Sequence, residues 1–331
     1  MPTPNEALST LRPDLGGSFE DFDHEQDRLG YIGYRVLPVL EVAKSAGTFG
    51  RIPLAQLLKK ADAKRHSRSG YPRGDWEFEQ ETFATFEFGF EEPVDNRDAA
   101  LYSDFFDAEM VSAQLARHTV LTAAEQRIAA LIFNTTTWTG ASLTTAIAAG
   151  KEWGTTSTTA ANATPIDDVE AAVVKVYDGT GMWPNSIIFN RKVFRRLRNC
   201  DQIIDRISSA GAGTPTKPSD ITTQMLAAVF DLDNVLVAGG SKNSANEGQA
   251  ATPAQIWDSE YAMVCRLATT NNVKEPCVGR SFHWGQDGST IGGTMETYDD
   301  AQLRGEVVRC RHDVHEKVIA AAFGHLISNV S

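Results

Sequence analysis

The stretch KKADAKRHSRSGYPRGDWEFEQETFATFEFGFEEPVD, from Lys59 to Asp95, changes from basic to acidic along its length. Six Lys and Arg residues lie between Lys59 and Arg73, and seven Asp and Glu residues follow between Asp75 and Glu92. The segment holds too few aliphatic side chains to build a core of its own. A strongly positive surface beside a strongly negative one therefore indicates a segment that contacts something outside itself.

The alternation of residues in this stretch predicts a long β-hairpin. Phe86, Phe88 and Phe90 occupy every second position, which is the period of a strand with one covered face. The apolar run at 51–58 predicts the partner strand, with HSRSGYPRGD at the tip between them. Connections of this length in compact domains are usually functional or docked elsewhere.

Composition limits the partners of the whole chain. The 331 residues carry a net charge of −12 and are 42% hydrophobic, which is typical of a soluble globular protein. An acidic surface opposes broad binding to nucleic acid or anionic membrane, because polyanion affinity comes from Lys and Arg. None of the four cysteines forms a C-x-x-C pair, which indicates reduced thiols. We expect no secretory signal and no membrane-spanning segment.

The segment DAEMVSAQLARHTVLTAAEQRIAALIFN predicts one long helix at 107–134, because it lacks Gly and Pro and begins with acids. The expected buried stripe is Val111, Leu115, His118, Leu121, Glu125, Ile128 and Ile132. A Thr-, Ala- and Gly-rich connector follows at 135–164.

The second half of the chain predicts mixed helices and strands. Pro165 suits the first position of a helix that Gly179 can end, and the strand NSIIFN leads to Asn190 as the cap of a helix at 191–207. Ser219 or Asp220 would cap the next helix, before the strand NVLVAGG and two further strands. The end, EVVRCRHDVHEKVIAAAFGHLISN, predicts a long strand or hairpin. This order indicates an α+β fold.

No motif predicts an enzyme, a cofactor site or a metal site. In CRHDVH, Cys310 and His312 share a strand face whereas His315 points away, so ordinary polar strand residues are favoured over zinc ligands. Phosphate-loop, G-x-S-x-G and H-E-x-x-H patterns are absent from the sequence. The basic segment RKVFRRLRN favours a solvated face or a subunit contact over a DNA-reading helix, because no helix-turn-helix partner precedes it.

Contacts between copies explain the charged segments better than a solvated loop does. A basic hairpin on one copy would meet an acidic surface of the next, and such heterologous contacts close into rings or extend into arrays. Ordering a hairpin whose phenylalanines lack cover is otherwise unfavourable. The candidate contact residues are Lys59, Lys60, Lys64, Arg65, Arg68 and Arg73, the arm acids Glu20, Asp21, Asp23, Glu25 and Asp27 or the carboxylates at 87–95, and Phe86, Phe88 and Phe90.

The order of these parts resembles the major capsid proteins of tailed bacteriophages with the Hong Kong 97 fold. The segments that carry the resemblance are FEEPVDNRDA, PNSIIFNRKVFRRLRNCDQIIDRI, VLVAGGSKNSA, IWDSEYAMV and HDVHEKVIAAAFGHLI. The resemblance implies an N-terminal arm at 1–40, an E-loop hairpin at 48–93, a P-domain at 94–162 and 306–331 with the spine helix at about 107–134, and an A-domain at 163–305.

The resemblance also implies a function: self-assembly into hexamers and pentamers of an icosahedral phage head around double-stranded DNA, without sequence-specific binding. A separate scaffolding protein, a portal and decoration proteins are the implied partners, with assembly in the bacterial cytoplasm and a final location in the virion. An encapsulin-type bacterial compartment shares the fold and is the first alternative. An α+β enzyme is the alternative from another class.

Overall fold

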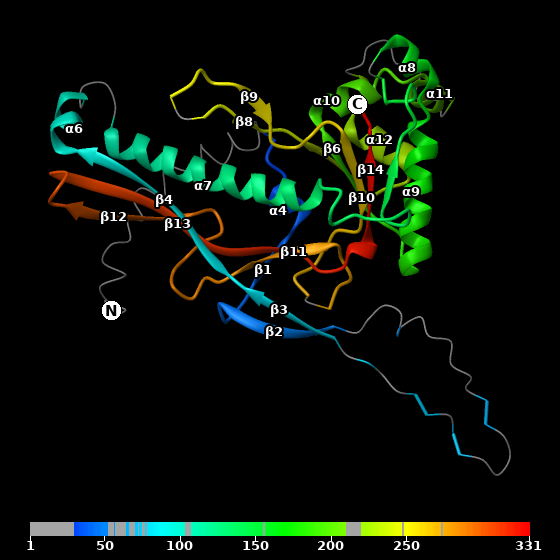
Figure 1. The fold of residues 1–331 in the computed structure, drawn as a ribbon, viewed down its shortest axis with the longest axis horizontal. Coiled ribbons are helices and arrows are strands. Elements are labelled where there is room, and N and C mark those ends of the chain that lie inside the picture. The colour runs from blue at the N-terminus through cyan, green and yellow to red at the C-terminus, as the bar shows by residue number, and fades with distance from the viewer. Residues whose placement is uncertain are drawn as a thin grey trace.

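Two sheets and a long helix organise the computed structural model, which describes residues 30–331 except 52–55, 57–63, 66–69, 72, 75, 76, 78, 103–106, 155, 210–219, 247 and 273. Figure 1 shows helix α7 (Ala108–Ile132) running along the body, with one sheet beneath it and a second sheet covered by helices at its carboxyl end. Across the described part of the chain, no helix is both long and apolar enough to cross a membrane.

The long sheet lies under α7. It contains β1 (Val39–Glu41), β11 (Gly279–His283), β13 (Gly305–Val318) and β12 (Thr294–Asp300), with β4 (Phe86–Asp95) paired along the other edge of β13. Helix α6 (Asn96–Tyr102) follows β4 directly.

Helix α7 confirms the predicted long helix but not the whole predicted stripe. The Asp107 side chain caps it by accepting hydrogen bonds from the backbone N–H groups of Glu109 and Met110. Its first half packs on the long sheet through small residues such as Ala113 and Ala116, which let the helix approach closely. The predicted positions Val111 and Leu115 are instead 37% and 51% exposed, and His118 is half-buried. Leu121, Glu125, Ile128 and Ile132 are buried as expected.

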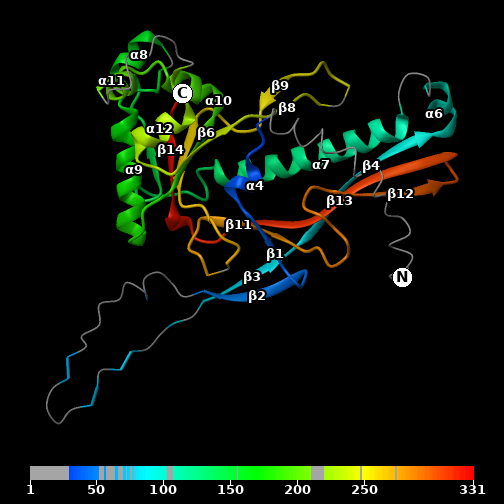
Figure 2. The same cartoon turned by 180° about the vertical axis from the view of Figure 1, so that it is seen from behind.

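The second sheet, here called the helix-covered sheet, contains β5 (Thr144–Ala146), β14 (Gly324–Ser328), β10 (Tyr261–Cys265), β6 (Ser186–Asn190) and β7 (Asn234–Ala238), in that order. Side chains alternate between its faces: Ile187 and Phe189 face the helices, whereas Ile188 packs with the end of α7. The sheet is therefore the middle layer at this end of the molecule (Figure 2).

The helices of this half are α8 (Ser157–Asn162), α9 (Pro165–Thr180), α10 (Arg191–Leu197), α11 (Asp201–Ser209) and α12 (Thr223–Phe230), with a short 3-10 turn at Ala321–Phe323. Helix α9 ends at Gly181, whose φ of 71° suits glycine, and not at Gly179. The Asn190 cap is confirmed.

Two details of these helices differ from the predictions. The single helix predicted at 191–207 is split between α10 and α11, because the N–H groups of Asn199 and Cys200 bond to carbonyls three residues back and turn the chain. Thr222, and not Asp220, caps α12 by accepting from the N–H of Met225, and the alternative Ser219 lies outside the described residues.

A hairpin exists, but the phenylalanines are not part of it, and most of the predicted partner strand at 51–58 lies outside the described residues. β2 (Ala46–Arg51) pairs antiparallel with β3 (Glu79–Ala84), whereas the phenylalanine strand is β4, which pairs with β13 from Phe86↔Val314 to Asp95↔Gly305. The prediction that the phenylalanines form one arm of the hairpin is therefore wrong. Period-2 alternation identifies a strand but not its partner, and Thr85 marks the point where the chain leaves the hairpin for the long sheet.

The sheets also cross the expected domain boundaries. β11 and β12, within 163–305, pair with β13 in the long sheet, and β14, within 306–331, joins the helix-covered sheet. The tail thus forms two strands in two sheets. A further two-stranded ribbon consists of β8 (Ser241–Asn243) and β9 (Pro253–Gln255). Of the N-terminal arm predicted at 1–40, residues 1–29 lie outside the described residues, and with them the candidate acids Glu20, Asp21, Asp23, Glu25 and Asp27. The remainder contains helix α4 (Gly33–Val36) and the start of β1 in the body.

Candidate assembly surface

The root of the hairpin is fixed to the long sheet by three aromatic rings. Phe83 of β3 stacks on Phe282 of β11 with centroids 4.9 Å apart, and Phe49 of β2 lies 5.8 Å from the same Phe282 ring. Aromatic pairs at such separations stabilise by about 0.5–1.5 kcal/mol beyond the area that they bury. The hairpin therefore leaves the body from a rigid base.

Polar side chains of β13 hold the same root. Lys317 Nζ donates to the carbonyl of Thr82 over 2.7 Å and lies 2.6 Å from Glu81 Oε2. His315 Nδ1 accepts from the N–H of Ala84 over 3.3 Å. Burial, aided by the charge of Lys317, lowers the pKa of His315 and so favours the neutral ring that can accept this bond.

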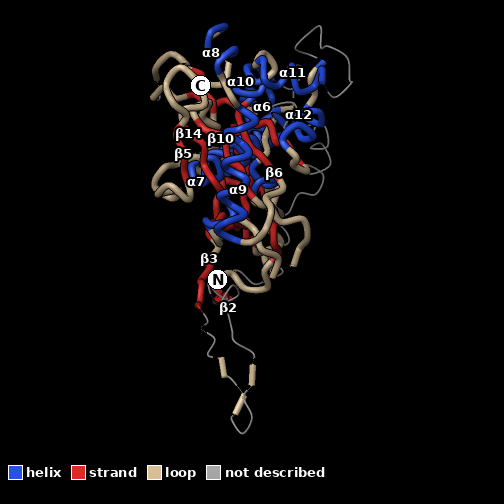
Figure 3. Tube along the Cα trace, turned by 90° about the vertical axis from the view of Figure 1, so that its right-hand side faces the viewer, coloured by secondary structure: helices blue, strands red, loops and turns tan. Residues whose placement is uncertain are grey.

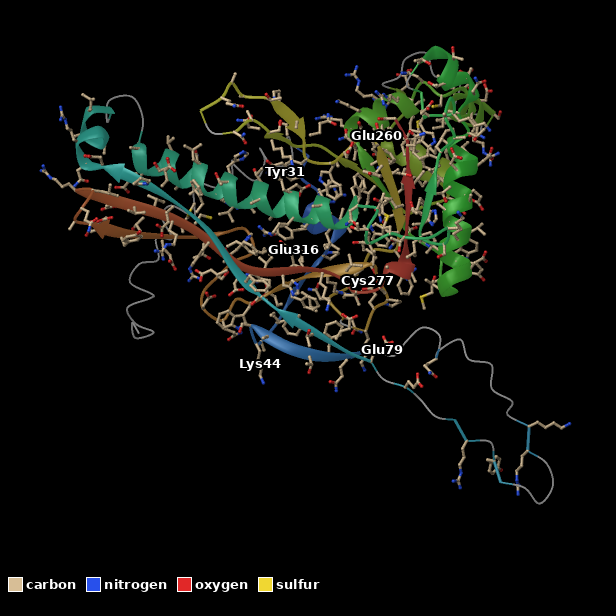
Figure 4. The ribbon with its side chains drawn as sticks, viewed as in Figure 1. Tyr31, Lys44, Glu79, Glu260, Cys277 and Glu316 are labelled. Carbon is tan, nitrogen blue, oxygen red and sulfur yellow. The ribbon has the colours of Figure 1, made fainter. Side chains whose placement is uncertain are left out.

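The described residues of the segment between β2 and β3 lie away from the body (Figures 1 and 4). In Figure 4, Glu79 marks the start of β3 near the point of departure. Of the predicted basic residues, Lys64, Arg65 and Arg73 are described and exposed, whereas Lys59, Lys60 and Arg68 lie outside the described residues. Tyr71 is 73% exposed, with the Arg65 guanidinium 4.9 Å from the centroid of its ring. We call the described residues within 64–74, which are Lys64, Arg65, Gly70, Tyr71, Arg73 and Gly74, the basic tip.

The face of the long sheet opposite α7 is polar. Because side chains alternate along β4, Glu87 and Glu91 point away from Phe88, whose ring lies beneath Arg127 of α7. Glu91 Oε1 lies 2.6 Å from Arg309 Nε, and Glu296 Oε2 lies 3.6 Å from Arg309 Nη1. We call this surface the open face; it consists of Glu87, Glu91, Asp287, Glu296, Arg309 and Arg311.

Carboxylates outnumber guanidiniums on the open face, four to two. Arg311 contacts Glu296 at 2.8 Å and also pairs with Asp287. Burial alone would lower the pKa of Arg311, but its hydrogen bonds and ion pairs with Glu296 and Asp287 outweigh burial and raise that pKa. The Glu87 and Glu91 side chains remain 61% and 45% exposed. A surplus of accessible negative charge is complementary to the basic tip.

The three candidate phenylalanines differ in their surroundings. Phe88 is covered within the chain: the Arg127 guanidinium lies 3.7 Å from its ring centroid, and the His312 ring meets it edge-on at 6.0 Å. The expectation that all three rings lack cover is therefore wrong for Phe88. Phe86 and Phe90 remain 58% and 40% exposed, so they stay available to another copy.

The segment CRHDVH forms part of the long sheet. His312 is fully buried, with Nε2 3.3 Å from Arg127 Nη2, and burial together with that guanidinium lowers its pKa to about 4. Burial raises the pKa of the Cys310 thiol to about 12. Among the described residues, no three His, Cys, Asp or Glu side chains are placed to hold a metal ion.

Sequence reasoning missed the role of Glu125. Its carboxylate accepts from the backbone N–H groups of Ile32 (2.9 Å) and Gly33 (2.7 Å) and from Trp257 Nε1 (2.6 Å). Glu125 thereby joins three elements: α7, which carries it, the start of helix α4 (Gly33–Val36) and the loop before β10, which carries Trp257. Helix α4 is where the N-terminal segment enters the body. An acid inside a mostly apolar helical stripe was the available signal.

The chain is similar to phage proteins over nearly its whole length. No family model matches it. The major capsid protein of Burkholderia phage BcepMu is 22% identical over 306 residues, which cover 91% of this chain and 92% of that protein. A phage-related protein from Bordetella bronchiseptica RB50 superposes with a TM-score of 0.68 at 18% identity, covering 97% of both chains.

Assembled shells share the same arrangement of elements. The capsid of cyanophage P-SCSP1u gives a TM-score of 0.57 at 10% identity, over 88% of this chain and 86% of that one. An encapsulin from Synechococcus elongatus gives 0.50 at 11% identity, over 90% and 86%. Identities this low identify a common fold, which both phage heads and encapsulins use.

Proposed function

We propose that this chain, which has the Hong Kong 97-type capsid fold, is a major capsid (coat) protein of a tailed bacteriophage. Copies self-assemble into hexamers and pentamers of an icosahedral head that encloses double-stranded DNA. Its role is structural and not enzymatic. The similarity to the BcepMu major capsid protein, which covers 91% of this chain and 92% of that protein, supports a phage capsid protein over an encapsulin with the same fold.

One structural observation carries the proposal: the projecting basic tip and the acidic open face belong to the same chain. The root is held by Phe83, Phe282 and Lys317, so β2 and β3 leave the body at a fixed place. A surface and its complement at different places on one subunit make heterologous contacts, which close into rings. The basic tip of one copy lies on the open face of the next.

The other partners follow from this role. A separate scaffolding protein and a portal direct closure of the head, and decoration proteins bind its outside. Packaged DNA is held without sequence-specific contacts, which agrees with a net charge of −12 that opposes tight binding to a polyanion. Subunits assemble in the bacterial cytoplasm and end in the virion.

Electron micrographs of the purified protein test the assignment. Rings or closed shells are expected, and a monomer that persists at all salt and protein concentrations would contradict it. The cargo separates the two shell types: packaged DNA supports a phage head, and an enclosed enzyme supports an encapsulin-type compartment. Saturable turnover abolished by a single substitution would instead support the enzyme.

Charge reversal tests the contact itself. In the variant Lys64→Glu, Arg65→Glu, Arg73→Glu, we expect shell formation to fall while the circular dichroism of the subunit is unchanged, because these three residues are exposed. The control Lys151→Glu, Lys242→Glu, Lys274→Glu changes the net charge equally at sites away from the tip. Equal assembly of the two variants would remove the basic tip from the contact.

A further inference from the structure

Helix α9 carries an apolar surface that no described part of the chain covers. Val174 and Tyr177 are each 39% exposed, and Met182 and Trp183, just after the helix, are 38% and 55% exposed. The Tyr177 and Trp183 rings stack with centroids 4.2 Å apart, and Arg266 Nη1 fixes the Trp183 carbonyl over 2.9 Å. The two rings are therefore an ordered platform and not two independent side chains.

Acids border this platform. Glu170 and Asp178 lie one helical turn before and after Val174, on the same face of α9, and both are exposed. Within the described residues neither acid has an ion pair. The surface thus combines an aromatic centre with a negative rim. Partners rich in guanidinium groups fit such a surface, because Arg forms ion pairs with acids and stacks on aromatic faces.

Helix α10 presents the complementary surface. Arg191, Lys192 and Arg195 are exposed, while Val193 and Phe194 turn into the core. Arg198 adds a fourth cation, stacked at 3.9 Å on the Phe194 ring. No ion pair to another described residue neutralises these four side chains. Four cations this close repel one another, so an acidic neighbour would stabilise them.

The two surfaces lie on different sides of one helical layer. α9 packs over β14 and β10, whereas α10 packs over β6 and β7, farther along the sheet order β5-β14-β10-β6-β7. α9 forms the outer edge of the body in Figure 1 and faces the viewer in Figure 3. α10 lies farther in on the same domain (Figures 1 and 2). Separate complementary sites suit a head-to-tail contact between copies and not a two-fold one.

We propose that the Tyr177–Trp183 platform of one subunit, with Glu170 and Asp178, binds the basic side of α10 on a neighbouring subunit. The inference rests on the proposed shell function and adds a second contact to that of the basic tip. Arg191 and Arg195 of the neighbour form ion pairs with the acidic rim and lie over the aromatic rings. Interface hot spots are enriched in these same residue types, Trp, Tyr and Arg.

Reciprocal charge reversal tests the contact in the full-length protein. The acidic-side variant is Glu170→Lys with Asp178→Lys, the basic-side variant is Arg191→Glu with Arg195→Glu, and the third carries all four changes. Sedimentation velocity measures the assembled fraction. We expect each two-residue variant to weaken assembly at least about tenfold in the subunit concentration required, and the four-residue variant to recover most of it.

Matched controls separate this contact from general effects. Asp205→Lys with Asp233→Lys changes the net charge as the acidic-side variant does, at exposed sites on the same domain, and should assemble like wild type. Trp183→Ala should weaken assembly without any change of charge. Thermal unfolding of the dissociated subunits confirms that each variant folds.

Several outcomes would overturn the inference. One is normal assembly of both two-residue variants, and another is failure of the four-residue variant to recover although it folds. If the basic-side variant assembles normally but its shells lose DNA, α10 faces nucleic acid and not a neighbour. A wild-type protein that never assembles would instead overturn the proposed function, so the two failures are distinguishable.

Discussion

Replacing Glu125 with Gln tests how the N-terminal segment is joined to the body. The Glu125 side chain is 4% exposed, and its two oxygens accept three N–H donors from Ile32, Gly33 and Trp257. A glutamine keeps the size and one carbonyl oxygen. Its amide nitrogen must then face either Gly33 on one side or Ile32 and Trp257 on the other, so at least one buried N–H loses its acceptor.

The magnitude follows from this count. Leaving one buried donor unpaired costs about 1–3 kcal/mol, and two bonds to a carboxylate become bonds to a neutral oxygen, each weaker by roughly 1 kcal/mol. Burial raises the pKa of Glu125, so ionising it in place also has a cost, which glutamine removes. We therefore expect a net loss of about 2–4 kcal/mol in the free energy of unfolding.

Urea unfolding of dissociated subunits measures this loss. The control is Glu170→Gln, which makes the same chemical change at an exposed position of α9 without a hydrogen-bond partner among the described residues. Gly33→Ala should destabilise as well, because a Cβ at that position would lie 2.5 Å from Glu125 Oε2 and 2.8 Å from Ile128 Cδ1. If Glu125→Gln unfolds within about 0.5 kcal/mol of wild type, the three bonds do not stabilise the junction.

Three further predictions concern pH, the hairpin root and the hairpin tip. In the folded chain, burial and the nearby Arg127 charge lower the pKa of His312 to about 4, so the unfolded state binds the proton first as pH falls. The free energy of unfolding should therefore fall by up to about 3 kcal/mol between pH 6.5 and pH 4. A urea midpoint that is unchanged between pH 7 and 4.5, or that depends equally on pH in His312→Gln, would contradict this. Lys317→Met removes the Thr82 and Glu81 contacts, and hydrogen exchange should quicken at 79–84 but not in β6. Replacing 52–78 with a short Gly-rich turn keeps both root strands, so the subunit should fold with an unchanged unfolding midpoint yet fail to form shells; wholesale unfolding would place the segment inside the core.

Local sequence signals located most elements of the fold. Helix α7 was predictable to within two residues because Asp107 caps it and no Gly or Pro interrupts it. Its buried stripe was not, because packing on the long sheet through Ala113 and Ala116 turns Val111 and Leu115 outward. Which residues of an amphipathic helix are covered depends on the partner surface, and the sequence of the helix alone does not contain that surface.

Strand partners were the main failure. Phe86, Phe88 and Phe90 alternate equally well as a hairpin arm or as an edge of the long sheet, and only the pairing with β13, more than 200 residues away in the chain, distinguishes the two. For the candidate contact residues, the sequence alone indicated exposed charge: Lys64, Arg65 and Arg73 are exposed cations, and Glu87 and Glu91 are exposed carboxylates. The ion pairs of Glu91 with Arg309 and of Glu87 with Arg311 could not be predicted, because they depend on the pairing of β4 with β13 in the long sheet.

A cryo-electron microscopy map of shells assembled from the wild-type protein tests the subunit contact directly. The account predicts that density for the basic tip of each subunit lies across the open face of its neighbour, near Glu87 and Glu91. A map in which the tip folds back onto its own body, with the open face of the neighbour exposed to solvent, would contradict it.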